Sequence, residues 1–308
     1  MHAAELVRSA FCILYEATYT ETIRHVEEAE NDVLRMHRKD LPHSLLTFDN
    51  CRLPAVLSAR DKLSILCYLM CGDACAYMHG MVKLLLGWFC KDFQTLQFSP
   101  LPGATNRTMK LCNSASEVSA NTHTRHDVFS VVVLHKSAHA SAQSSNQASI
   151  QKGETRYIVD ITGPQYGWFT PAMKYDTYQR NHVLTFLSGY GTGQYVKHTP
   201  YMHGSRIMWD EAWRYQMILW VDERLVARLD RADDLLPEHV FLGQAEDGQR
   251  AREEFLRVFK ELVYEALREF GDVGQAWHKA LRERSVADYG GEALGCPGQQ
   301  GCGAVVSS

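Results

Sequence analysis

The stretch VFSVVVLH, residues 128–135, decides the fold class, because its β-branched residues favour a β-strand. Residues 156–162, RYIVDIT, predict a partner strand, and the small polar residues 137–153 predict a flexible connection between the two. Apolar residues recur at helical spacing on both sides of this hairpin. We therefore expect an α+β fold in which helices pack against an antiparallel sheet.

Three helices are expected before the hairpin. Apolar residues recur at helical spacing through roughly residues 3–37, and Ser58 has the residue type and position of an N-cap for a second helix. A break in the pattern then starts a third helix near Asp73 or Ala74, and this helix ends at Leu86.

The C-terminal third of the chain has a different character. Residues 208–229 and 251–270 predict amphipathic helices, and residues 274–285 predict a shorter one. Residues 96–125, which are rich in Pro, Gly, Asn, Ser and Thr, predict a loop. The expected division is residues 1–200 for a core with its N-terminal helix, 201–290 for a helical extension and 291–308 for a disordered Gly-rich tail.

Composition argues against several classes of function. The formal net charge of -4 provides no basic field for nucleic acid. No run approaches the ~18 apolar residues of a membrane helix, and the first residues lack the pattern of a secretory signal, so we expect no membrane association. Nine scattered cysteines predict free thiols in a reducing compartment, and hence a cytoplasmic protein. His135 and His139 lack convergent further ligands, so no metal or cofactor is expected.

Three residues have the types and positions of a cysteine-based catalytic triad. Cys75 is expected in the opening turn of the third helix, where unpaired backbone N–H groups stabilise a thiolate and later an oxyanion. His126 lies at the entrance to the first strand and is the expected base. Asp160 lies in the partner strand, where a carboxylate needs a polar partner, and it is expected to orient the histidine.

Alternatives remain for each role. Cys71 is a rival nucleophile, although its expected place is the end of the preceding helix. Asp127 adjoins the histidine but points to the opposite face of the strand. Gln165, Tyr166 and Trp168 follow the second strand and are weaker candidates for contacting the substrate or the oxyanion; Gln165 can equally fix the turn.

The order of three segments resembles a known superfamily. GDACAYMHG (72–80), RHDVFSVVV (125–133) and RYIVDITGPQYG (156–167) are similar to the cysteine helix and the two strands of transglutaminase-like enzymes, a branch of the papain-like fold. The resemblance covers roughly residues 55–170. It implies a cysteine-bearing helix packed on an antiparallel sheet, and a mechanism that passes through a thioester.

The resemblance leads us to expect an intracellular acyltransferase that forms or exchanges amide bonds. Its partners are a small-molecule or peptide acyl donor and an amine acceptor. A cysteine peptidase or amidase that uses water is the alternative, and a non-catalytic binding module on the same fold is another. The motif GYGTG, residues 189–193, lacks the lysine of a phosphate-binding loop and predicts a flexible loop near the site.

Overall fold

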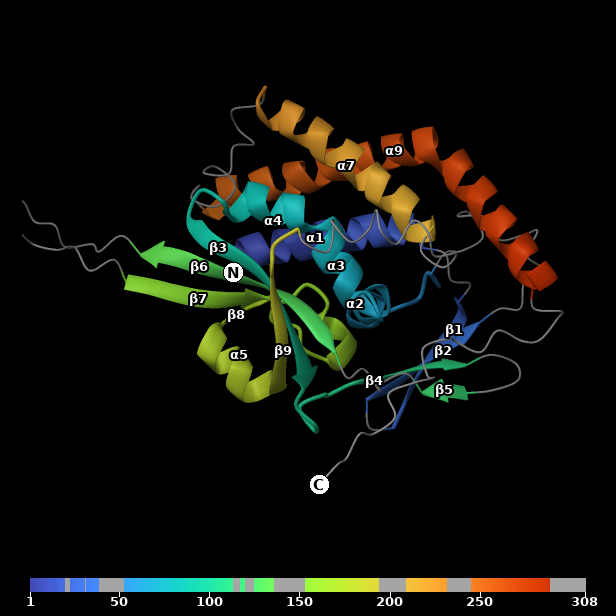
Figure 1. The fold of residues 1–308 in the computed structure, drawn as a ribbon, viewed down its shortest axis with the longest axis horizontal. Helices are drawn as coiled ribbons and strands as arrows, with labels where there is room; N and C mark the ends of the chain where they lie inside the picture. Colours follow the sequence, from blue (N-terminus) through green and yellow to red (C-terminus); the bar gives the residue numbers. More distant parts are fainter. Residues whose placement is uncertain are drawn as a thin grey trace, which may run out of the picture.

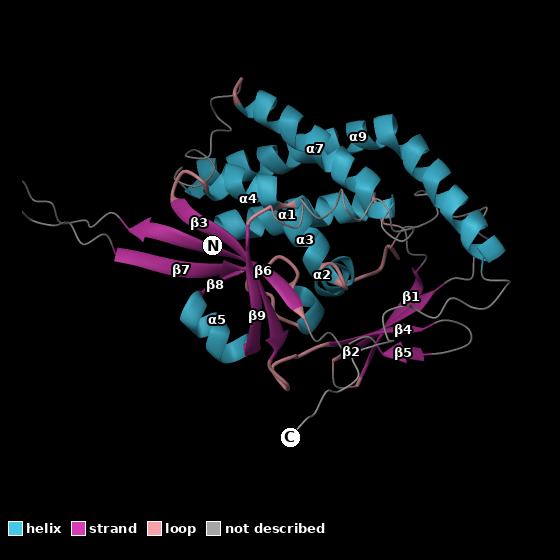
Figure 2. Cartoon of the chain, in the orientation of Figure 1, coloured by secondary structure: helices cyan, strands magenta, loops and turns pink. Residues whose placement is uncertain are grey.

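The structure, a computed structural model, describes residues 1–19, 23–30, 32–38, 53–112, 117–119, 125–135, 153–193, 209–231 and 245–288. These residues form the α+β fold that the sequence predicts, with antiparallel strands under a layer of helices (Figures 1 and 2). The predicted connection at 137–153, apart from its last residue, and the predicted tail at 291–308 lie outside the described residues.

The helices are α1 (His2–Ala17), α2 (Ala59–Cys67), α3 (Cys71–Tyr77), α4 (His79–Leu86), α5 (Tyr175–His182), α7 (Trp209–Leu229) and α9 (Ala245–Asp288). The strands are β1 (Ile23–Ala29), β2 (Val33–Arg38), β3 (Cys90–Pro100), β4 (Thr108–Cys112), β5 (Glu117–Ser119), β6 (His126–His135), β7 (Gly153–Val159), β8 (Ala172–Lys174) and β9 (Val183–Gly191). A short 3-10 helix, η2, spans Gly163–Tyr166.

The larger sheet has the strand order β8-β7-β6-β3-β9, and every neighbouring pair is antiparallel. The predicted hairpin is its centre: β6 pairs with β7, and Phe129 lies opposite Val159. A smaller sheet has the order β1-β2-β4-β5, in which β2 and β4 run parallel. The predicted hairpin thus organises the larger sheet.

The inner face of the larger sheet packs against α1, α3, α4, α7 and α9 in one hydrophobic core. Phe129 and Val159 contribute from the strands, and Ile218 and Phe259 contribute from the C-terminal helices. The outer face packs against α5 in a separate cluster. The C-terminal helices therefore share their core with the N-terminal helix and the sheet.

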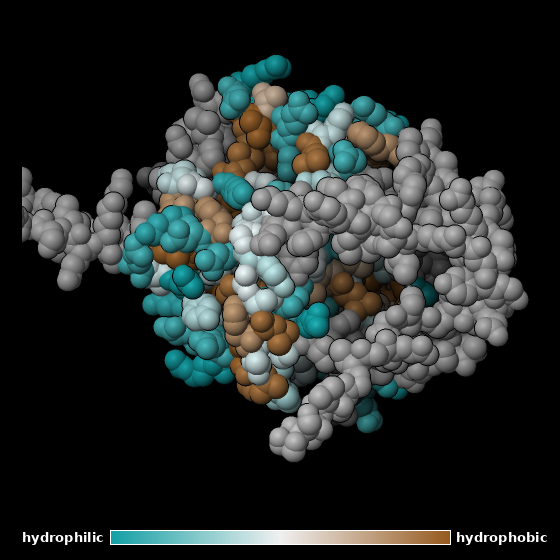
Figure 3. Space-filling view, viewed as in Figure 1, coloured by the Kyte–Doolittle hydropathy of each residue, from teal (hydrophilic) through white to brown (hydrophobic). Residues whose placement is uncertain are grey.

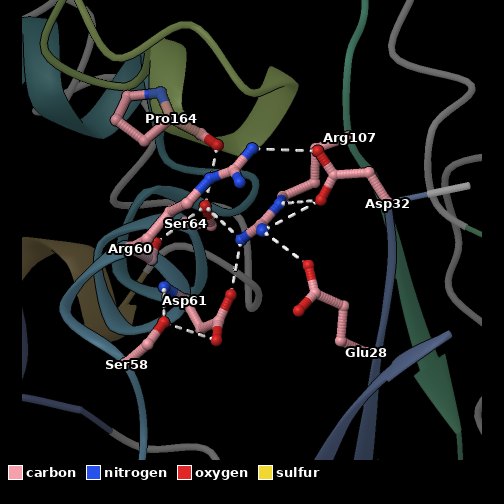
Figure 4. Close-up of polar contacts among 8 residues, drawn as sticks. All are labelled: Glu28, Asp32, Ser58, Arg60, Asp61, Ser64, Arg107 and Pro164. Atoms are coloured by element: carbon pink, nitrogen blue, oxygen red, sulfur yellow. Dashed lines mark hydrogen bonds and ion pairs between the residues drawn. The ribbon is translucent and has the colours of Figure 1, made fainter.

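The smaller sheet is tied to α2 through one buried guanidinium. Arg107, which is 1% exposed, donates to Asp61 at 2.8 Å and to Asp32 at 3.0 Å (Figure 4). It also donates to the Ser64 hydroxyl and contacts the Glu28 carboxylate. Because a buried charge needs partners, these contacts fix the position of the smaller sheet against α2.

Two predicted helix boundaries are confirmed. The Ser58 hydroxyl accepts a hydrogen bond from the Asp61 N–H at 3.1 Å, so Ser58 caps α2. The helix expected to run from Asp73 or Ala74 to Leu86 is two helices, α3 and α4, with Met78 between them; only its end at Leu86, before Gly87, is as expected.

Other expectations for the secondary structure were wrong. The first helix ends at Ala17, and residues 23–29 and 33–38 are the strands β1 and β2, because Leu34 and Met36 alternate into a small core of their own. The expected loop at 96–125 contains the end of β3 and also β4 and β5, since pairing with distant strands outweighs a turn-like composition.

The C-terminal helices also differ from the expectation. The two helices predicted at 251–270 and 274–285 are one helix, α9, because the glycine at Gly271 is tolerated inside it. Within the described part of the chain, none of the helices has both the length and the apolar content needed to cross a bilayer.

Candidate active site

Two residues predicted for the site meet in the structure. His126 is the first residue of β6, and Asp160 directly follows β7, so the hairpin brings both to one end of the sheet. The Nε2 atom of His126 lies 3.1 Å from Oδ1 of Asp160, and both side chains are almost fully buried. The strand therefore ends one residue before the carboxylate, which was expected inside it.

Asp160 is held as a carboxylate by several partners. The Tyr178 hydroxyl, on α5, donates to its Oδ2 at 2.7 Å. Burial favours the neutral acid, but the charge of His126 and the hydrogen bonds from His126, Tyr178 and the Gly163 backbone outweigh it and lower the pKa of Asp160. Both oxygens are thus engaged, which fixes the plane of the carboxylate.

His126 favours its protonated form despite its burial. Burial alone lowers the pKa of an imidazole, but Asp160, by charge and hydrogen bond, and then Cys71 raise the pKa of His126 to about 10. The second ring nitrogen, Nδ1, is buried and has no hydrogen-bond partner among the described residues. One nitrogen is therefore occupied by the carboxylate, and the other remains available for exchanging a proton.

The cysteine beside this imidazole is Cys71. It is partly exposed, and its side chain is close enough to contribute to the protonation of His126. Cys75, the residue expected to react, lies one helical turn further along α3, is 2% exposed and packs in the hydrophobic core. Burial, followed by the negative charges around it, raises the pKa of the Cys75 thiol well above its usual value. Of the two candidate cysteines, Cys71 is therefore the one beside the imidazole, and Cys75 is buried in the core.

The position of Cys71 beside the imidazole depends on where α3 begins. The helix starts at Cys71, whereas the sequence placed its start near Asp73 or Ala74. Leu69 has a left-handed backbone with φ of 65°, and its N–H donates to Oε1 of Gln165 at 3.1 Å. This bond fixes the turn after α2, so the chain enters a new helix with Cys71 in its first position.

Tyr166 and Trp168 lie beside the imidazole, and Gln165 precedes Tyr166 in η2. The Tyr166 ring is 4.9 Å from the His126 ring and stacks on Trp168 at 4.7 Å. The indole N–H of Trp168 donates to the Ala104 carbonyl. The Tyr166 hydroxyl and Gln165 Nε2 are buried without a hydrogen-bond partner among the described residues, so both are donors available to a bound group.

Asp127 lies on the other face of β6. It accepts a hydrogen bond from Gln97 at 3.1 Å, and its Oδ2 faces Gly72 at the start of α3. Asp160 is the carboxylate that lies within hydrogen-bond distance of the His126 ring, at 3.1 Å.

Two supporting groups had no signal in the sequence. Tyr178 lies on a short polar helix, and nothing in its spacing points to a buried carboxylate. Asp73, in the first turn of α3, hydrogen-bonds the Tyr15 hydroxyl, and Arg214 of α7 lies near both groups. The helix that carries Cys71 is therefore fixed from α1 and α7 as well as from the sheet.

The described residues contain no group of three or more His, Cys, Asp or Glu side chains able to hold a metal ion. His139, considered above as a metal ligand, lies outside them. A scan against protein-family models and searches of curated proteins and of solved structures found no match to this chain.

Proposed function

We propose that the chain is a cysteine-dependent acyl-transfer enzyme in which Cys71 is the nucleophile, His126 the base and Asp160 the residue that orients the base. The observation that carries the proposal is the buried His126–Asp160 pair beside a partly exposed thiol at the start of a helix. A cysteine nucleophile needs these three elements: a favoured thiolate, a base and an orienting group.

The arrangement of the elements also supports the transglutaminase-like, papain-like type of fold as a proposal. The helix that carries Cys71 packs on the strand that carries His126, and the antiparallel partner strand leads into Asp160. The segment RYIVDITGPQYG runs from β7 into η2, and its Asp160 and Tyr166 both lie against the imidazole.

In the proposed mechanism, the two ring nitrogens of His126 have different roles. Nε2 of His126 stays on Asp160, and Nδ1 takes the proton from the Cys71 thiol. The thiolate attacks the acyl carbon, and the leaving group departs with the proton of the imidazolium. A thioester on Cys71 remains. An amine then attacks the thioester, its proton passes to His126, and the C–S bond breaks to release an amide and the thiol.

The developing oxyanion needs hydrogen-bond donors. The first N–H groups of α3 have no acceptor within the helix, and they lie beside Cys71. The Tyr166 hydroxyl is a second donor, because it is buried, unpartnered among the described residues and close enough to Cys71 for that group to raise its pKa. The side-chain oxygen of Gln165 accepts the Leu69 N–H. Its Nε2 group has no partner among the described residues and can donate to a ligand.

The proposal is tested by measuring the iodoacetamide alkylation rate of each cysteine against pH, with peptide mass spectrometry as the readout. We expect Cys71 to react faster below pH ~8.5, the ordinary thiol value, than Cys12 and Cys112, which are also partly exposed. His126→Ala removes this advantage. Cys75→Ala, a matched change one turn away, leaves it in place.

A second experiment separates the reactions. The chain is incubated with a p-nitrophenyl acyl ester, with and without methylamine, and the acylated enzyme is followed by intact mass. Formation of the methylamide supports acyl transfer. Formation of the free acid at the same rate with and without methylamine supports a hydrolase. If Cys71 reacts no faster than the reference thiols and is never acylated, the site binds without catalysis and the proposal fails.

A further inference from the structure

A cavity of about 450 Å³ lies on the outer face of the larger sheet, between β3, β9 and the start of α5. Its volume is typical of sites for small molecules. Aromatic side chains line it, among them Tyr175, Phe186 and Tyr190, together with one cation, Arg156, and one anion, Asp92. The catalytic groups described above do not line it.

Glycines of the GYGTG motif create the space. Residues 189–191 are the end of β9 and not the expected flexible loop, and Gly189 and Gly191 lie opposite Leu96 and Gln94 of β3. A Cβ on Gly191 would meet nothing within 4 Å, and a Cβ on Gly189 would press on Leu96 at 3.3 Å. Because residues 189 and 191 point to the same face of β9, the two glycines leave that part of the face without side chains.

The two charged residues of the cavity, Arg156 and Asp92, indicate what kind of ligand would bind there. The Arg156 guanidinium lies 5.8 Å from the centre of the Tyr175 ring, and it makes no ion pair with the described residues. Asp92 lies in the irregular register of β3, between Lys91 and Gln94, and has a left-handed backbone with φ of 52°. Irregularities of this kind redirect a side chain out of the ladder. Neighbouring Lys91 pairs with Glu154 and also lies close enough to Asp92 for both carboxylates to raise its pKa, so Lys91 is shared between the two.

Apolar surface continues from the cavity along β9. Leu184 is 55% exposed and Phe186 is 51% exposed, and Figure 3 shows a hydrophobic patch over this strand. A ligand that covers Phe186 would remove this surface from water, which favours a ligand with an aromatic or large aliphatic part.

We propose that this cavity binds a free α-amino acid with an aromatic or large aliphatic side chain. The carboxylate binds Arg156, the ammonium group binds Asp92, and the side chain packs on Tyr175 and Phe186. A simple anion would leave the Asp92 carboxylate facing it, and a simple cation would face Arg156. A ligand with both charges matches both groups. The inference does not depend on Cys71.

The test is calorimetric titration of the full chain with three probes: L-phenylalanine, N-acetyl-L-phenylalanine, which lacks the ammonium group, and L-phenylalaninamide, which lacks the carboxylate. We expect saturable binding of phenylalanine, and binding about tenfold or more weaker for each blocked probe, because each loses a charge-assisted contact.

Two variants assign the contacts. Arg156→Gln should abolish the preference for phenylalanine over the amide, and Asp92→Asn should abolish the preference over the acetylated probe. Asparagine also tolerates a left-handed backbone, so the second variant keeps the local structure. Arg180→Gln, an exposed change on α5 outside the cavity, is the control.

The proposal would be overturned if the three probes bound with equal affinity or if none of them gave saturable binding. It would also be overturned if the two variants kept the parent's preference for phenylalanine over the blocked probes. Cys71→Ala should bind phenylalanine as the parent does. A loss of binding in that variant would place the ligand at the catalytic pair and would overturn the assignment to this cavity.

Discussion

The Tyr178 hydroxyl donates a hydrogen bond of 2.7 Å to the carboxylate oxygen of Asp160 that His126 does not use. A residue of the outer helix α5 thus fixes the carboxylate that holds the imidazole on the end of β6. This contact connects the packing of the outer face of the sheet to the chemistry at its end.

Removing that hydroxyl tests the connection. Tyr178→Phe keeps the ring packing and removes one hydrogen bond to a buried charge, so the free energy of unfolding should fall by about 1.5–3 kcal/mol. Urea denaturation measures the change. Tyr157→Phe, whose hydroxyl makes no hydrogen bond within the described residues, is the control. A change of similar size in both variants would mean that the Asp160 contact contributes little.

The orienting role of Asp160 is tested against the neighbouring carboxylate Asp127. Asp160→Asn removes the charge that raises the pKa of His126, so the pKa should fall and acylation of Cys71 should slow by about 10²- to 10⁴-fold. Asp127→Asn should leave the titration of His126 in place, because Asp127 contacts Gln97 instead. NMR of the imidazole and intact-mass kinetics provide the two readouts. Equal effects of both variants would contradict the assignment.

Stability should depend on pH through the same pair. The pKa of His126 is raised from 6.5 to about 10, so its contribution is complete below pH 6.5 and is lost as the pH rises toward 10. The pKa of Asp160 is lowered from 3.8, so its contribution is complete above pH 3.8 and is lost on acidification.

Urea denaturation across this range measures the profile. The parent chain should lose stability between pH 6.5 and about 10 more steeply than a His126→Gln, Asp160→Asn double variant, in which neither group titrates. Thiols also ionise in this range, and Cys71 interacts with His126, so both proteins carry Cys71→Ala to remove that thiol. Parallel profiles would show that the pair is not ionic in the folded state.

Local sequence patterns predicted the fold where they were strong. The β-branched run in β6 and its partner β7 paired as expected, and Ser58 and Gly87 marked real helix ends. The expectation failed at β1 and β2, because these short strands are stabilised by pairing with each other and with β4, which lies some seventy residues further along the chain.

In the candidate site too, local sequence predicted some residues, while others depend on contacts between distant parts of the chain. His126 and Asp160 could be predicted because a hairpin fixes their separation in space. The choice between Cys71 and Cys75 depended on one helix boundary, and that boundary is set by a bond from Leu69 to Gln165, far away in sequence. Glycine and aspartate after Cys71 resemble a helix break, so no local pattern could show that the helix had already begun.

The Arg107 cluster leads to a prediction about how the smaller sheet is fixed. Ser64, which accepts from Arg107, also donates to the Pro164 carbonyl beside the candidate site, so the cluster connects the two regions (Figure 4). Arg107→Ala leaves Asp61 and Asp32 without their common partner, but Asp32 keeps Arg60 and Asp61 keeps Ser58, so the free energy of unfolding should fall by about 1.5–3 kcal/mol.

The conservative change Arg107→Lys separates charge from geometry. A lysine keeps the charge but cannot donate from three nitrogens, so its stability should lie between those of the parent and the alanine variant. Hydrogen exchange should show faster opening of β1, β2 and β4 than of β6 and β7 in both variants. Uniform exchange through both sheets would mean that the guanidinium stabilises the whole fold and does not fix the smaller sheet in particular.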